Sequence, residues 1–224
     1  MLGEMARGSA LDPREGMIAA IEDDTRETAE WTGRTALAPR TLEAMRAVRR
    51  EAFIPPAVAD RAYENRPQAI GHQQTISQPF IVALMTDLLE LKPEHVVLEV
   101  GTGSGYQAAV LAKLTRQVFS VEVIGELAER ARAALAAEGI SNVEVRVGNG
   151  AAGWPEHAPF DAIIVTAAAG DVPQALVDQL RSPGRMAIPV GAPNADQELT
   201  LIKKSAEGRV SKRRVLPVAF VPMT

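Results

Sequence analysis

A glycine-rich turn between an apolar strand pattern and an apolar helix pattern is the feature of this sequence that most restricts its fold. Gly101, Gly103 and Gly105 follow the apolar run 96–100, and the apolar residues from about 104 onward have the period of a helix. Glycine adopts backbone angles that other residues avoid, so it lets the chain turn sharply out of a strand and lets the backbone approach a ligand closely. The segment predicts the strand, turn and helix of a parallel sheet, with a binding site at the turn.

Short runs rich in β-branched residues alternate with helical patterns after this turn. Such alternation is typical of βαβ units, which form a mainly parallel sheet with helices on both faces. Two further strand patterns near the C-terminus are joined by a tight turn at Glu207 and Gly208, which predicts an antiparallel edge. The predicted strands are 96–100, 117–122, 143–147, 160–165, 185–190, 199–203 and 210–215, and the predicted helices are 104–114, 124–138 and 173–180.

The first part of the chain has a helical character instead. Residues 9–31 and 39–52 have helical patterns, and Gly33 separates them. The clearest amphipathic helix starts at Pro79 and stops before Pro93. Its apolar face consists of Ile81, Leu84, Met85, Leu88 and Leu89. We expect an N-terminal helical segment with the loop that precedes Pro79, residues 1–92, packed on an α/β domain, residues 93–224, as one compact unit.

Composition argues against several classes of site and partner. The 224 residues include no cysteine, which rules out disulfides and thiolate chemistry, and the three histidines lack metal-ligand spacing, so we expect no metal site. The formal net charge of −4 gives no reason to expect nucleic-acid binding, and we interpret the basic stretch 203–214 as solvated strands around a turn. No run approaches the ~20 apolar residues of a membrane span, and the N-terminus lacks the apolar core of a signal peptide. We therefore expect a cytoplasmic protein without membrane partners, and we favour a monomer.

Two acidic residues near the glycines restrict the ligand. The spacing G-x-G-x-G differs from the G-x-G-x-x-G of dinucleotide sites. Glu99, just before the turn, would repel a phosphate but suits the ammonium group of an amino acid. Glu122 ends the next predicted strand, where a carboxylate accepts hydrogen bonds from ribose hydroxyls. A nucleoside with an amino-acid tail satisfies both carboxylates; the alternative is a tight turn without a ligand.

Longer matching segments support a resemblance to a known family. They are REAFIP at 50–55, QTISQP at 74–79, LEVGTGSGYQAAVL at 98–111, GWP at 153–155, APFDAIIVTAA at 158–168, IPVG at 188–191 and FVPMT at 220–224. From about residue 47 onward the chain resembles the protein-L-isoaspartate (D-aspartate) O-methyltransferases, a branch of the Rossmann-like class I methyltransferases. The resemblance implies S-adenosylmethionine as cofactor and S-adenosylhomocysteine as product. It also implies methylation of the free α-carboxylate of L-isoaspartyl residues in damaged proteins and peptides, which initiates their repair.

The resemblance also assigns site residues. Ser77 matches the active-site serine of the family, which orients the acceptor carboxylate; without the resemblance it would be read as a helix N-cap. Free backbone N–H groups at the start of the helix from Pro79 favour the same anion. The expected cofactor-binding residues are Gln74, Thr75, Ile76, Ser77, Glu99, Gly101, Thr102, Gly103, Ser104, Gly105, Glu122, Asn149, Gly150, Thr166 and Thr224. The expected acceptor-binding residues are Thr75, Ile76, Gln78, Thr166, Ala167 and Val221.

Two positions depart from the family pattern. Asn149 stands where the family usually has an aspartate near the adenine, and Gln73 stands where it commonly has a glycine. If the backbone at Gln73 needs a positive φ, this residue adds strain or reshapes the loop. The departures leave two alternatives open, namely a related carboxyl methyltransferase that acts on another peptide or small acid, and a non-catalytic peptide-binding module.

Overall fold

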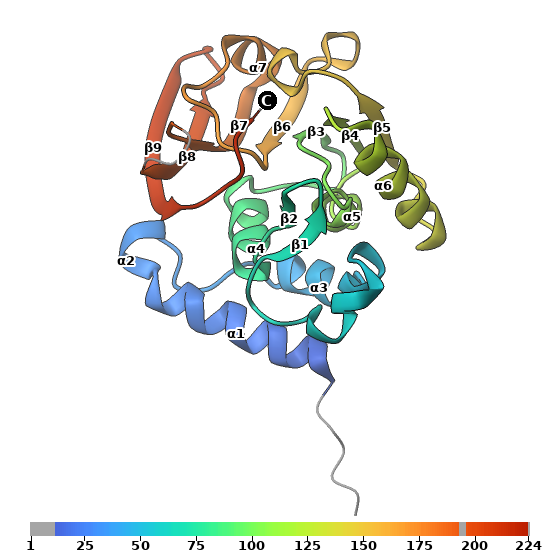
Figure 1. Ribbon diagram of the computed structural model, residues 1–224. Helices are drawn as coiled ribbons and strands as arrows, with labels where there is room; N and C mark the ends of the chain where they lie inside the picture. Colours follow the sequence, from blue (N-terminus) through green and yellow to red (C-terminus); the bar gives the residue numbers. More distant parts are fainter. Residues whose placement is uncertain (1–11, 193–195, 224) are drawn as a thin grey trace, which may run out of the picture.

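A seven-stranded sheet forms the centre of the computed structural model, which describes residues 12–192 and 196–223 (Figure 1). Its strand order is β5-β4-β3-β6-β7-β8-β9. The first five strands in this order run parallel, whereas β8 and β9 pair antiparallel at the edge. The bounds are β3 (Val96–Val100), β4 (Gln117–Glu122), β5 (Val143–Val147), β6 (Phe160–Val165), β7 (Leu180–Val190), β8 (Gln197–Lys204) and β9 (Val210–Val218). The predicted mainly parallel sheet with an antiparallel C-terminal edge is confirmed.

The strand order changes direction at β3, which pairs with β4 on one side and with β6 on the other. Val100, the last residue of β3, lies opposite Val121 of β4 and Val165 of β6. In open α/β sheets a crevice forms at such a point, outside the carboxyl ends of the strands. The fold therefore brings the residues that directly follow β3, β4 and β6 to one place.

Helices cover both faces of the sheet. One core cluster packs the N-terminal helices with α5 and α6, and a second packs α7 against the opposite face. Along β3, Val97 belongs to the first cluster, whereas Leu98 and Val100 belong to the second, as expected for a strand buried on both faces. The helices are α1 (Pro13–Glu27), α2 (Ala29–Thr32), α3 (Pro39–Ala47), α4 (Pro79–Leu88), α5 (Tyr106–Ala112), α6 (Gly125–Ala137) and α7 (Gln174–Gln179).

The structure differs from the sequence-based prediction in four places. The predicted helix 9–31 divides at Thr28 into α1 and α2, and its residues 9–11 lie outside the described residues. A short antiparallel hairpin, β1 (Gln68–Gly71) and β2 (Gln74–Ile76), precedes α4 and was not predicted. The predicted helix 39–52 ends at α3 because Val48 adopts an extended backbone, and the chain continues as the 3₁₀ turns η1 (Arg50–Phe53) and η2 (Pro56–Arg61). Strand β7 begins five residues earlier than predicted, since Leu180 already pairs with β6 before a register shift.

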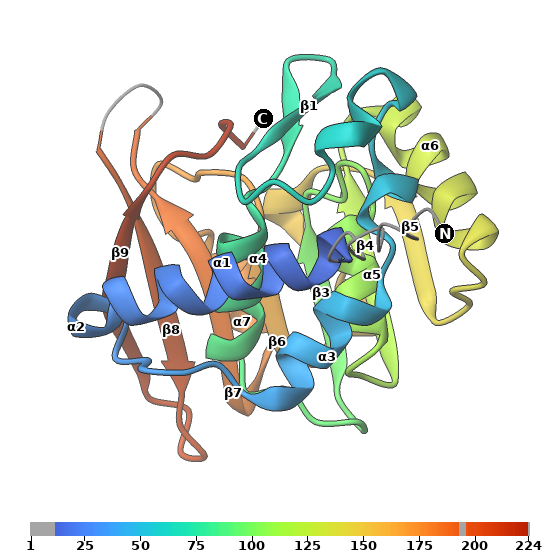
Figure 2. The same cartoon turned by 90° about the horizontal axis from the view of Figure 1, so that it is seen from below.

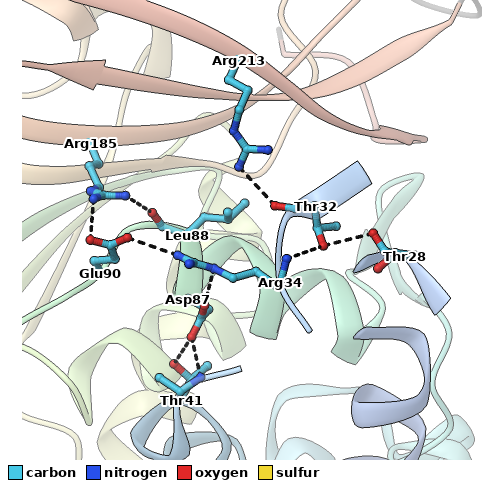
Figure 3. Close-up of polar contacts among 10 residues, drawn as sticks. Thr28, Thr32, Arg34, Thr41, Asp87, Leu88, Glu90, Arg185 and Arg213 are labelled. Carbon is cyan, nitrogen blue, oxygen red and sulfur yellow. Dashed lines mark hydrogen bonds and ion pairs between the residues drawn. The ribbon is translucent and has the colours of Figure 1, made fainter. Parts of the chain in front are cut away.

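Polar contacts anchor the N-terminal helices to the end of α4 and to the antiparallel edge (Figure 3). Arg34 Nε lies 2.9 Å from Asp87 Oδ2, and Arg34 Nη2 lies 3.2 Å from Glu90 Oε1. Arg213 Nη2, on β9, donates a hydrogen bond to the carbonyl oxygen of Thr32 at 3.2 Å. Helix α1 packs across α4, close to the loop that precedes α4 (Figure 2).

Residues from both sides of the predicted boundary at residue 92 share one core cluster. Met17 and Met45 of the N-terminal helices are buried in the same cluster as Val97 of the sheet and Leu127 of α6. The division into 1–92 and 93–224 stays a prediction about the organisation of the chain.

Candidate active site

A pocket opens at the carboxyl ends of β3, β4 and β6, where the strand order changes direction. It collects residues from six separate parts of the chain, and Glu122 is the only one of these lining residues with a charged side chain. The lining residues are Gln74, Thr75, Ile76, Ser77, Val82, Val100, Gly101, Thr102, Gly103, Ser104, Tyr106, Gln107, Val121, Glu122, Val123, Ile124, Gly150, Thr166, Ala167, Val221, Pro222 and Met223. Within the part of the chain that the structure describes, the pocket therefore has a negative charge and no cation, which is unsuited to a phosphate group.

The glycine turn forms one wall of the pocket, and its backbone requires glycine. Gly101 and Gly103 have φ of 92° and 54°, in the left-handed region that residues with a Cβ rarely adopt. A Cβ on Gly101 would also lie 2.5 Å from Thr166 Oγ1, which is too close for any side chain. Thr166 Oγ1 in turn donates a hydrogen bond to the carbonyl oxygen of Gly101 at 2.6 Å, which ties β6 to the turn.

Glu122 is fixed at the end of β4 by backbone donors. Its Oε2 accepts a hydrogen bond from Gly103 N at 2.8 Å, and its Oε1 accepts one from Ile124 N at 3.0 Å. Each carboxylate oxygen has two lone pairs, so both oxygens retain the capacity to accept a hydrogen bond from a ligand hydroxyl. The ribose-binding role of Glu122 stays a prediction.

Glu99 lies beneath the glycine turn and does not line the pocket. Its side chain is fully buried, and it accepts a hydrogen bond from Ser120, whose hydroxyl lies 2.6 Å from that of Thr102. Burial raises the pKa of Glu99 to about 8. The expected direct contact between this carboxylate and a ligand ammonium group stays a prediction, because Glu99 does not line the pocket and its only side-chain hydrogen bond among the described residues is to Ser120.

The loop before α4 forms the opposite wall. Ser77 lines the pocket, but the N-cap of α4 is Gln78, so the simple capping role for Ser77 is wrong. The expected anion site at the start of α4 is weaker than predicted: Pro79 has no N–H group, and Phe80 N already donates to Asn65 Oδ1 at 3.0 Å. The polar side chains on this wall are those of Gln74, Thr75 and Ser77.

The β1–β2 hairpin that carries this loop has a strained turn. His72 and Gln73 both have positive φ, 52° and 58°. Two such residues define the tight turn that favours asparagine and glycine. The expectation that Gln73 occupies a position suited to glycine is confirmed.

Arg50 connects this loop to the rest of the site, and the sequence analysis assigned it no role. Its side chain is fully buried; Nη2 donates to the carbonyl oxygen of Ser77 at 2.7 Å and Nε to that of Ala62 at 2.8 Å. Its guanidinium group lies 4.7 Å from the ring centre of Tyr106, the first residue of α5. Burial lowers the pKa of Arg50. The only sequence signal was its place in the matched segment 50–55.

The C-terminal segment closes the pocket beside β6. Ala168 N donates to the carbonyl oxygen of Val221 at 2.8 Å, and Met223 N donates to that of Ala168 at 2.8 Å. The side-chain amide of Gln197 makes two hydrogen bonds to the backbone of Phe220. Its Oε1 accepts from Phe220 N at 2.7 Å, and its Nε2 donates to the Phe220 carbonyl oxygen at 3.0 Å. Thr224, expected to contact the cofactor, lies outside the described residues.

Most of the expected site residues meet in this pocket. Those that line it are Gln74, Thr75, Ile76, Ser77, Gly101, Thr102, Gly103, Ser104, Glu122, Gly150, Thr166, Ala167 and Val221. Gly105 is the N-cap of α5, and Asn149 is exposed and accepts a hydrogen bond from Ala151 N at 2.9 Å. Gln78 faces a neighbouring groove instead. Among the described residues, no cluster of acidic residues and histidines could hold a metal ion, and no helix is long and apolar enough to span a membrane.

Sequence reasoning missed several apolar residues of the pocket. Val100 and Val121 are the last or next-to-last residues of β3 and β4, and Ile124 directly precedes α6. Their position at strand ends was a usable signal, because ligands bind there. Pro222 and Met223 lie in the matched segment 220–224, beside the expected site residue Val221, and this place in the chain was their signal.

The fold and this pocket define a class I methyltransferase. The model of the protein-L-isoaspartate(D-aspartate) O-methyltransferase family matches residues 30–224, and the chain belongs to this family. A protein-L-isoaspartate O-methyltransferase 2 from Syntrophobacter fumaroxidans is 56% identical over 98% of this chain and 90% of its own length. Another from a Polaromonas species is 54% identical over 93% of this chain and 99% of its own length.

Two solved structures agree with this assignment. A protein-L-isoaspartate O-methyltransferase superposes with a TM-score of 0.79 at 27% identity, covering 93% of this chain and 65% of that one. A β-aspartate methyltransferase from Plasmodium falciparum, solved in complex with S-adenosyl-L-homocysteine, has a TM-score of 0.72 at 26% identity and covers 91% of this chain and 98% of its own.

Proposed function

We propose that this chain transfers a methyl group from S-adenosylmethionine to the free α-carboxylate of L-isoaspartyl residues in damaged proteins and peptides, the first step of their repair. The observation that carries the proposal is the junction between the pocket and a second groove. Thr75, Ser77, Thr166 and Val221 line both. A cofactor in the pocket and a polypeptide in the groove would therefore meet beside Ser77.

The residues of the pocket fit S-adenosylmethionine. Glu122 suits the ribose hydroxyls, and Val100, Val121 and Ile124 offer an apolar surface for the adenine ring. The backbone of the glycine turn, including Gly101, suits the amino-acid part. The single negative charge of the lining favours a ligand with a positive charge. When bound, this cofactor supplies an activated methyl group attached to a positively charged sulfur.

The reaction requires positioning more than acid or base catalysis. An α-carboxylate has an unperturbed pKa of ~3.5, so it is ionised at neutral pH and no residue needs to remove a proton. We assign to the Ser77 hydroxyl the role of orienting this carboxylate, and to Arg50 the role of holding the Ser77 backbone in place. Fixing the acceptor in line with the methyl group makes the transfer effectively unimolecular.

Matched peptides that differ only in containing isoaspartate or aspartate test the proposal. With radiolabelled S-adenosylmethionine, we expect base-labile methyl ester on the isoaspartyl peptide and background levels on the aspartyl peptide. Equal labelling of both peptides, or labelling of neither, would contradict the proposal. Calorimetric titration with S-adenosylhomocysteine would then separate an enzyme with another acceptor from a module that binds without catalysis.

The remaining expectations from composition stay predictions. They concern the cytoplasmic location, the monomeric state and the lack of nucleic-acid partners. Size-exclusion chromatography with light scattering measures the mass in solution, and a value near the 23.9 kDa of one chain is expected.

A further inference from the structure

A groove of about 620 Å³ continues from the pocket along the N-terminal arm of the molecule, and we call it the acceptor groove. One side is formed by α1 and the start of α4, and the other by the end of β9 and the segment after it. Its lining residues are Asp24, Thr28, Pro67, Thr75, Ser77, Gln78, Phe80, Ile81, Thr166, Leu216, Pro217, Val218, Ala219, Phe220 and Val221. The groove is therefore largely apolar, with few polar groups.

Asp24 is the only charged side chain among these lining residues. Its Oδ2 accepts hydrogen bonds from Asn65 Nδ2 at 2.9 Å and from Gln78 Nε2 at 3.1 Å. Both donors are neutral amides, so they fix the carboxylate without cancelling its charge. No cation forms an ion pair with Asp24 among residues 12–192 and 196–223.

Asp24 is also linked to the reacting end of the groove. Gln78, which it holds, directly follows Ser77, and Asn65 fixes the first turn of α4 through Phe80 N. An extended peptide advances ~3.3 Å per residue, so a polypeptide with its isoaspartyl residue at Ser77 places its neighbouring residues along the groove. The side chain of one of these neighbouring residues then lies close to the negatively charged Asp24.

The N-terminal arm that carries Asp24 lies outside the part of the chain that the family model matches. The match begins at residue 30, whereas Asp24 and Thr28 of the groove come before it. Directly after this arm, Arg34 pairs with Asp87 and Arg213 donates to the carbonyl oxygen of Thr32, and these contacts fix the chain that follows the arm (Figure 3). The α1 side of the groove is thus contributed by residues that the family model does not match.

We propose that Asp24 forms a subsite for a cationic side chain, lysine or arginine, adjacent in sequence to the isoaspartyl residue of the acceptor. The subsite rests on the proposed function and specifies which damaged sequences the chain selects. A half-buried carboxylate that pairs with no cation among the described residues attracts a cation and repels an acidic neighbour. The preference weakens as ionic strength rises, because the groove opens to solvent.

The test uses isoaspartyl peptides that carry lysine, norleucine or glutamate at each of the two positions on either side of the isoaspartyl residue. At one of these positions we expect kcat/KM of the wild-type chain to be about 10-fold higher for lysine than for glutamate, mostly through KM. Asp24→Asn should reduce this ratio to about 2-fold or less, because the amide keeps a hydrogen-bond acceptor but loses the charge.

Asp23→Asn is the matched control on the same helix, since Asp23 is exposed, pairs with Arg26 and does not line the groove. This variant should keep the preference for lysine. Equal kcat/KM of the wild-type chain for all these peptides, or an unchanged preference in Asp24→Asn, would overturn the subsite. The measurements on the wild-type chain test the proposal even if Asp24→Asn fails to fold. If no isoaspartyl peptide is methylated at all, the proposed function itself is wrong.

Discussion

The glycine turn and the acceptor groove face each other across one site but are built in different ways. The turn is a continuous segment between β3 and α5, and its backbone angles follow from the local sequence. The groove joins α1, the loop before α4 and the C-terminal segment, which are held together by side chains such as Arg50, Asp24 and Gln197. Such a division allows the acceptor to change while the cofactor-binding turn is kept.

Replacing Gly101 should have the largest effect. The effect should be on the affinity for the cofactor, because Gly101 belongs to the glycine turn and not to the acceptor groove. In Gly101→Ala the positive φ and the clash with Thr166 Oγ1 should weaken S-adenosylhomocysteine binding about 10- to 100-fold, measured by calorimetry. Gly16→Ala is the control, since a Cβ at that exposed helical position meets nothing within 4 Å. An unchanged affinity in Gly101→Ala would show that the turn does not need glycine there.

Replacing Arg50 should affect the acceptor side more than the cofactor side. Arg50→Met removes the donors to Ser77 and Ala62, so the loop shifts and kcat falls about 10-fold or more. Arg50→Lys should recover part of this loss, because a lysine keeps a donor and a charge. Equal losses in methyl transfer and in S-adenosylhomocysteine affinity would instead indicate a general structural role.

The pH dependence of stability tests whether Glu99 is a buried support of the turn. Its folded-state pKa of about 8 exceeds the ordinary value of 4.5, so the folded state binds more protons and loses stability as pH rises between these values. The loss is on the order of 1 kcal/mol per pH unit and should be absent in Glu99→Gln, measured by urea unfolding from pH 5 to 8. Parallel stability curves for the two proteins would exclude the raised pKa.

Cofactor binding to the same variant tests the direct role that the sequence suggested for Glu99. Since its side chain does not line the pocket, Glu99→Gln should bind S-adenosylhomocysteine within about 3-fold of the wild type. A much larger loss of affinity would instead support direct contact between Glu99 and the ligand ammonium group.

Gln73 should give the smallest effect. Gln73→Gly relieves the left-handed strain of the hairpin turn and should raise the free energy of unfolding by about 0.5–1 kcal/mol, with little change in activity. The free energy of unfolding of Gln73→Asn should lie between those of the wild type and Gln73→Gly, because asparagine tolerates this conformation better than glutamine. A decrease in stability on thermal unfolding would mean that the glutamine side chain contributes in another way.

The same comparison explains which features the sequence could predict. The parallel sheet, the turn and Glu122 follow from local periodicity and spacing, so their positions were predicted correctly. The β1–β2 hairpin lacks the asparagine-glycine signal of a tight turn, and Arg50 stands in a run of two arginines without any pattern that indicates burial. Asp24 likewise stands in an acidic stretch, and only the packing of α1 on α4 directs it into the groove.

The claim that cofactor and acceptor sites are separable is tested most directly by Ser77→Ala, measured both by calorimetry with S-adenosylhomocysteine and by methyl transfer to an isoaspartyl peptide. We predict that the cofactor affinity stays within about 2-fold while kcat/KM for the peptide falls about 10-fold or more. Unchanged methyl transfer, or an equal loss of cofactor affinity, would contradict the account.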